Sequence, residues 1–99
     1  MSKQNKYTKS ARDEDCTVRI PGCPNDTATT VLAHYRMMGT SGMGYKPNDL
    51  QGAFCCAWCH DQVDGRAKSD LTREELRLYH AEGVLRTVQR QIDKGVLKV

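Results

Sequence analysis

The alternation of apolar and polar residues predicts two short strands joined by a long loop. Residues 29–36 are β-branched and apolar, which favours a strand that ends near His34. Residues 48–54 predict a second, shorter strand that leads back toward the central cysteines. Residues 37–47 contain three glycines and predict a loop, which in a compact domain is often functional. We therefore expect a hairpin, and a purely flexible connector is the alternative for the loop.

Two helices are expected to follow the hairpin. Residues 57–63 predict a short helix that ends around Gly65, a favourable residue just past a helix C-terminus. Thr72 and Glu75 match a capping box at the start of a longer helix, which Gly95 ends. The sequence thus predicts a C-terminal helix over about 72–94, and residues 96–99 predict a short terminal strand.

The long helix carries an apolar pattern and a basic pattern. Gly83 indicates a kink or close packing in its middle. Five apolar residues recur at helical spacing and predict its buried stripe: Leu78, Ala81, Leu85, Val88 and Ile92. A row of basic residues lies on another face of the helix: Arg86, Arg90 and Lys94. This row could contact phosphates, and a solvated face is the alternative.

Length and composition indicate one small domain with a thin core. The chain has 99 residues, and only 38% of them are hydrophobic. Residues 1–15 are basic and polar, which predicts a flexible arm able to touch phosphates; a solvated tail is the alternative. A single domain is expected over residues 16–99, with its ββα core at about 16–66. No signal peptide or membrane-spanning run is visible, so we expect a cytoplasmic protein with no membrane partner and with reduced thiols. The net charge of +3 is compatible with nucleic acid, and an ordinary surface explains it equally.

The five cysteines suit a metal better than disulfides, because an odd number of thiols cannot all pair. Cys16 and Cys23 bracket a Pro-Gly turn, and Cys56 and Cys59 have zinc-knuckle spacing. Together they predict a closed, four-thiolate structural zinc site, with Cys55 as a buried spectator. Zinc binding of this kind supplies folding free energy on the order of 10 kcal/mol. Unligated core cysteines are the alternative.

A closed zinc site has no open position for chemistry, so catalysis would require a second site. His60 and Asp64 lie four residues apart and project from one helix face, where they could share a metal, whereas Asp61 points about 100° away. An exposed side-chain pair is the alternative. His34 ends the first strand, and an unperturbed histidine side chain is mostly neutral at pH 7 and can take a proton from water. His80, within the long helix, is interpreted as structural.

The order of these residues resembles the HNH, or ββα-metal, endonucleases. The segment 16–64 more closely resembles the small proteins of lambdoid prophages described as YbcO-like putative nucleases, and the similarity extends more loosely through the C-terminal helix. The residues that carry it are Leu32-Ala33-His34, Asn48, Cys56-Ala57-Trp58-Cys59-His60 and the four-cysteine set. The resemblance implies an α+β fold: a small ββα-metal finger stapled by a four-cysteine zinc, followed by a long helix.

The resemblance also implies roles. His34 would be the general base that activates water for attack on a phosphodiester, and Asn48 would hold the connecting loop so that His34 keeps its orientation. His60 would bind the catalytic divalent ion (Mg²⁺, Mn²⁺ or Zn²⁺), with Asp64 as second ligand. Arg36 would clamp the phosphate. DNA is the implied partner.

One position departs from the family pattern. Many members place an aspartate ligand directly before the base histidine, and here that residue is Ala33. The catalytic ion would then depend on the helix residues and a third group, for which Asp49 is a candidate. The leading hypothesis is a phage or prophage endonuclease acting in recombination or DNA processing. The alternative is a catalytically inactive zinc module that binds DNA or a protein partner.

Overall fold

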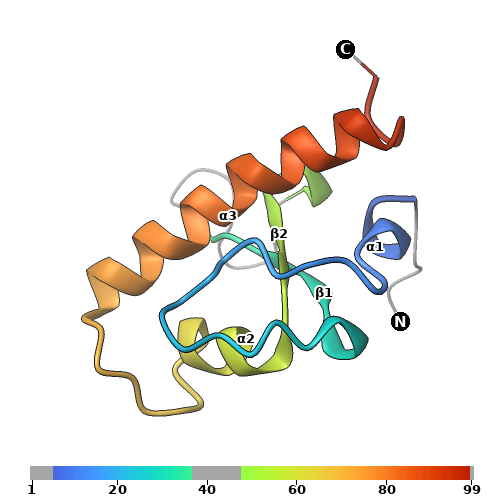
Figure 1. The fold of residues 1–99 in the computed structure, drawn as a ribbon. Helices are drawn as coiled ribbons and strands as arrows, with labels where there is room; N and C mark the ends of the chain where they lie inside the picture. Colours follow the sequence, from blue (N-terminus) through green and yellow to red (C-terminus); the bar gives the residue numbers. More distant parts are fainter. Residues whose placement is uncertain (1–5, 37–47, 99) are drawn as a thin grey trace.

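The computed structural model describes residues 6–36 and 48–98, and it confirms the predicted α+β class. A long C-terminal helix lies across a small hairpin, and a short helix follows the second strand of that hairpin (Figure 1). The elements in chain order are α1 (Lys6–Ser10), the 3₁₀ turn η1 (Thr27–Thr29), β1 (Val31–His34), the 3₁₀ turn η2 (Asp49–Gln51), β2 (Gly52–Cys55), α2 (Ala57–Val63) and α3 (Arg73–Asp93). Among the described residues, no helix has both the length and the apolar character needed to cross a membrane.

The predicted hairpin is confirmed, although its strands are shorter than expected. β1 and β2 are antiparallel, with Leu32 opposite Phe54 and His34 opposite Gly52. Residues 49–51 form a 3₁₀ turn rather than strand, because the Asn48 side chain accepts a hydrogen bond from the Leu50 N–H and caps that turn. The predicted loop over 37–47 lies outside the described residues. The register places His34 opposite Gly52, at the end of the hairpin where the chain leaves β1 and returns into β2.

The hairpin buries both of its faces. Ala33 and Ala53 belong to the cluster that contains the cysteines, whereas Leu32 and Phe54 belong to a second cluster on the other side. The second cluster is covered from the N-terminal side, where Ala11 is buried and Tyr7 packs against it. The prediction of a flexible arm is therefore wrong for residues 6–15, which form α1 and a packed segment. Residues 1–5 are not described.

The basic row of α3 holds this N-terminal segment in place. Arg90 and Lys94 lie 2.9 Å and 2.8 Å from the Glu14 carboxylate, and Arg86 donates to the Thr17 carbonyl at 2.8 Å. Burial alone would raise the pKa of Glu14, but the hydrogen bonds from Lys94 and Arg90 outweigh it and lower that pKa. The three cations thus have partners within the chain, although their side chains remain partly exposed.

Helix α3 begins and ends as predicted. Thr72 and Glu75 form the capping box, and Gly95 follows the helix with a positive φ of 75°. The predicted terminal strand is wrong for residues 96–98, because the N–H groups of Val96 and Leu97 turn back to the Gln91 carbonyl.

The predicted buried stripe of α3 is also wrong. Leu78 and Leu85 are 59% and 71% exposed. The buried residues lie on a different face of the helix and are small or polar: His80, Gly83, Thr87 and Gln91.

The close approach of α3 to the backbone of Val18 explains why this face of the helix is the buried one. A Cβ atom built on Gly83 would lie 3.0 Å from Val18 Cγ2 and 3.1 Å from the Val18 backbone. The predicted glycine packing is thereby confirmed. One turn later the Thr87 hydroxyl accepts from the Phe54 N–H at 2.9 Å and bonds the Thr17 hydroxyl at 2.9 Å. Helix α3 therefore docks through backbone contact and hydrogen bonds, which hydrophobic spacing does not reveal.

A bulky residue at position 83 should break this docking. We expect Gly83→Leu to lower the free energy of unfolding by about 1–3 kcal/mol or more, because the added atoms would enter the space of Val18. In a domain of this size, each kcal/mol shifts Tm by roughly 4–8 °C. Thermal melts of the zinc-loaded protein measure the shift. Glu82→Leu, at the neighbouring exposed position, is the matched control and should leave Tm nearly unchanged; equal melts for both variants would contradict this docking.

Candidate metal centre and active site

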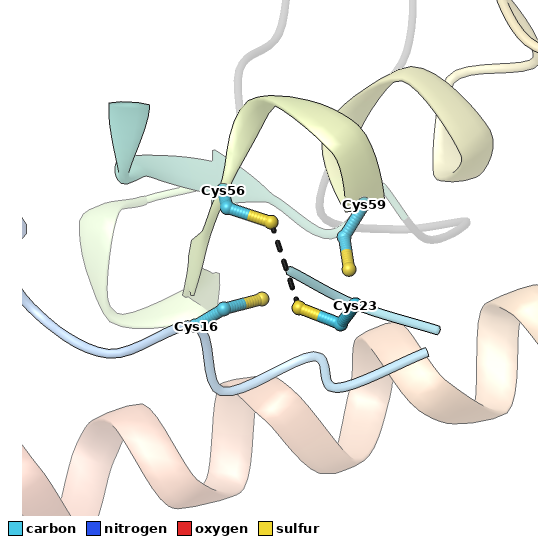
Figure 2. Close-up of side chains that lie close together, drawn as sticks. All are labelled: Cys16, Cys23, Cys56 and Cys59. Carbon is cyan, nitrogen blue, oxygen red and sulfur yellow. Dashed lines mark hydrogen bonds between the residues drawn. The ribbon is translucent and has the colours of Figure 1, made fainter. Parts of the chain in front are cut away.

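The four predicted zinc ligands are brought together from two separate segments. Cys16 and Cys23 come from the N-terminal segment, and Cys56 and Cys59 come from the start of α2 (Figure 2). Their sulfur atoms all lie within 4.8 Å of one another, and the Cys23–Cys56 sulfurs are 3.6 Å apart. Four sulfurs about 2.3 Å from one tetrahedral ion are about 3.8 Å apart. The cluster therefore fits a zinc ion without rearrangement of the backbone.

Hydrogen bonds and burial shift the pKa values of the cluster's thiols in opposite directions. Hydrogen bonds from Cys55 and Cys59 lower the pKa of Cys16, while the hydrogen bond to Cys16 raises that of Cys59. Burial raises the pKa of Cys23 to about 11. A divalent ion bound by the four sulfurs would favour their thiolate forms. Cys55 lies outside the four-sulfur set and bonds Cys16.

A pocket of about 490 Å³ opens where the ends of β1 and α2 meet the first turns of α3. His34, Arg36 and Asp64, three of the predicted site residues, all line it. Arg73 and Arg77 add positive charge from α3, and Asp64 is the one carboxylate among the described lining residues. A concave site with this excess of cationic groups favours an anionic ligand such as phosphate.

His34 is held by a carboxylate. Its Nε2 lies 2.7 Å from Asp49 Oδ1, and both side chains are partly exposed. An ionised carboxylate only accepts hydrogen bonds, so Nε2 donates and Nδ1 keeps the lone pair of the neutral ring. Asn48 caps the 3₁₀ turn that carries Asp49, so it acts on His34 through that turn. Asp49, considered from sequence as a third metal ligand, instead pairs with the histidine.

His60 and Asp64 lie on one face of α2, as their spacing predicts. His60 Nε2 is 3.1 Å from Asp64 Oδ2. Arg66 bonds Asp64 at 3.1 Å and Asp61 at 3.2 Å. Two ligands bound at about 2.0–2.2 Å to one ion are themselves about 3 Å apart, so the His60–Asp64 pair fits a shared divalent ion.

Helix α3 contributes pocket residues that the motif did not indicate. The Arg77 guanidinium lies over the Tyr35 ring at 4.6 Å and donates to the Arg36 carbonyl at 3.2 Å. Arg73, Arg77 and His80 recur at i, i+4 and i+7, which places them along one side of the helix. That spacing was the available signal in the sequence, but only the docking of α3 shows that this side faces the hairpin.

Comparison with known proteins identifies the family. A family model described as "Putative nuclease YbcO" matches residues 5–96. The chain belongs to the YbcO family. Two curated YbcO proteins, from Escherichia coli strain K12 and from Enterobacteria phage 82, are each 40% identical to it over 91 residues, which cover 91% of this chain and 94% of each relative.

A solved structure extends this similarity to the fold. It is described as a putative bacteriophage protein from Escherichia coli K-12, and it superposes with a TM-score of 0.75 at 36% sequence identity. The match covers 90% of this chain and 99% of the solved one. The arrangement in Figure 1 is therefore shared with a solved phage-related protein over most of this chain. The family is described as one of putative nucleases, and one of the two relatives comes from a phage.

Proposed function

We propose that this YbcO-family protein is a metal-dependent DNA endonuclease of phage or prophage origin that hydrolyses phosphodiester bonds in recombination or DNA processing. The observation that carries the proposal is the pocket that gathers His34 and Arg36 from the end of β1 with Asp64 from the end of α2. A buried core histidine would have no need of an orienting carboxylate at 2.7 Å or of a cationic pocket around it. The family description as nucleases supports the same class of reaction.

His34 acts as the general base in this proposal. Asp49 fixes the tautomer, and Nδ1 accepts a proton from the attacking water. Arg36 and the neighbouring arginines bind the phosphate oxygens and hold the scissile phosphorus in line with that water. A structural zinc held by the four cysteine thiolates would have no open position, so it would stabilise the fold and take no part in the reaction.

His60 and Asp64 would hold a divalent ion such as Mg²⁺, Mn²⁺ or Zn²⁺. Such an ion supplies Lewis-acid stabilisation of the phosphate and of the leaving oxygen. Arg66 contacts the Asp64 carboxylate and orients it beside His60.

Paired carboxylates on α2 allow a matched test of this site. We expect Asp64→Asn to reduce nicking of supercoiled plasmid by about ten- to a hundred-fold and to raise the Mn²⁺ concentration required, because a ligand charge is lost. Asp61→Asn also loses a contact with Arg66 but lies outside the pocket, and it should nick at the wild-type rate. Equal rates for the two variants would contradict the proposed ion site.

The alternative function is a catalytically inactive zinc module that binds DNA or a protein partner. The observation that favours it is Ala33, since the strand supplies no carboxylate ligand where many HNH members have one. The same plasmid assay decides between them. Wild-type protein that binds DNA but nicks no form of it with Mg²⁺, Mn²⁺, Ni²⁺ or Zn²⁺ would establish the binding module.

A further inference from the structure

His80 lies in the pocket with one ring nitrogen unused. Its Nε2 is 2.9 Å from the Ala33 carbonyl oxygen, and the ring packs edge-on against Tyr35 with centroids 5.1 Å apart. A carbonyl oxygen only accepts hydrogen bonds, so Nε2 carries the proton and Nδ1 keeps its lone pair. Among the described residues, Nδ1 has no hydrogen-bond partner. The residue is 8% exposed and lines the pocket beside Asp64.

The surroundings of the ring keep it neutral. Burial lowers the pKa of His80 despite the hydrogen bond to Ala33, and the charged groups that act on it are His60, Asp64 and Arg77. A neutral imidazole whose one N–H is bound to a backbone carbonyl is the usual state of a metal-bound histidine, because that bond fixes the tautomer and the ring orientation. His80 is thus prepared to bind through Nδ1.

His80 lies beside Ala33, the strand position that lacks a carboxylate ligand. His60 and Asp64 provide two ligand atoms 3.1 Å apart, and a catalytic ion commonly has three protein ligands. The methyl group of Ala33 cannot act as the third ligand of the ion. His80 bonds the backbone of that same residue and lines the same pocket as Asp64.

We propose that His80 Nδ1 is the third protein ligand of the divalent ion held by His60 and Asp64, in place of the carboxylate absent at position 33. This inference rests on the proposed function, since it completes the same ion site. In the described residues only the four cysteines bring three or more ligand atoms within 4.8 Å. Binding would therefore draw the partly exposed side chains of His60 and Asp64 toward the fixed ring of His80.

Two isosteric substitutions separate a ligand from a structural residue. In His80→Gln the new amide nitrogen overlies Nε2 and keeps the bond to Ala33, but no atom replaces Nδ1. In His80→Asn the side-chain oxygen overlies Nδ1, but the bond to Ala33 is lost. A ligand role predicts that Mn²⁺ binds more weakly to the glutamine variant than to the asparagine variant. A purely structural role predicts that asparagine is the more damaging change, in both Tm and Mn²⁺ affinity.

The experiment titrates zinc-loaded full-length protein with Mn²⁺, and free Mn²⁺ is counted by electron paramagnetic resonance. Mn²⁺ competes poorly with zinc for thiolates, so the cysteine site stays filled. We expect wild type to bind one further ion and His80→Gln to raise its Kd by at least about ten-fold. An unchanged Kd in His80→Gln, or no further ion in wild type, would overturn the inference. Ion binding that depends on His80 without any plasmid nicking would refute the nuclease function and leave the ion site standing.

Discussion

Removal of the structural zinc is expected to unfold the protein. Structural zinc supplies on the order of 10 kcal/mol, and a domain of this size has a total stability of roughly 5–15 kcal/mol. The core that remains is small: apart from the cysteines, its fully buried side chains are few, and the largest is Phe54. Incubation with a strong chelator, or the substitution Cys59→Ser, should abolish the helical circular dichroism signal and the cooperative melt.

Cys55→Ser is the matched control for this prediction. Cys55 is as deeply buried as Cys59 but lies outside the four-sulfur set, and a serine hydroxyl can still donate to Cys16. We expect this variant to keep one zinc per chain by elemental analysis and to melt cooperatively. A chelated wild-type protein that retains its helical signal and a sharp melt would refute a zinc-dependent fold.

Loss of the proposed base is expected to have the second large effect. General base catalysis typically contributes about 10²–10⁴-fold, so His34→Ala should lower the rate of plasmid nicking by that factor. The side chain is 29% exposed and contacts Asp49 at the pocket rim, so its removal should leave the fold intact. The rate is measured at saturating Mn²⁺, so that a change in ion affinity cannot account for the loss.

Two measurements make the His34 result specific. Zinc content and Tm of His34→Ala should match wild type, because the cysteine cluster is built from other elements. Asp49→Asn should lose less activity, since the amide oxygen can still accept from Nε2 although it carries no charge. An alanine variant that nicks at the wild-type rate would remove His34 from the mechanism.

Local sequence signals predicted local structure well. The capping box of α3 depends on two residues three positions apart, and the structure forms it as expected. The cysteine set was equally readable, because zinc imposes a strict chemical requirement on a few residues. The hairpin and α2 also follow from short-range patterns and are confirmed.

Long-range pairing was not predictable from these patterns. Glu14 meets Arg90 and Lys94 near the other end of the chain, and nothing near Glu14 in sequence indicates them. The buried face of α3 was predicted from Leu78 and Leu85, whereas the structure buries residues whose partners are backbone groups of other segments. The pairing of Asp49 with His34 depends on the same kind of information, because the hairpin must close before the two meet.

The hydroxyl pair at Thr17 and Thr87 joins three segments in a closed ring of hydrogen bonds. The Phe54 N–H donates to Thr87, Thr87 to Thr17, and Thr17 to the Phe54 carbonyl. Thr17 directly follows the zinc ligand Cys16, and Thr87 lies two turns beyond His80 on α3. A loss of order at the thiolate cluster would thus be transmitted to the wall of the pocket. If the protein is the proposed nuclease, we expect zinc loading and catalytic activity to be lost together, so that any zinc-free fraction of the protein is inactive rather than partly active.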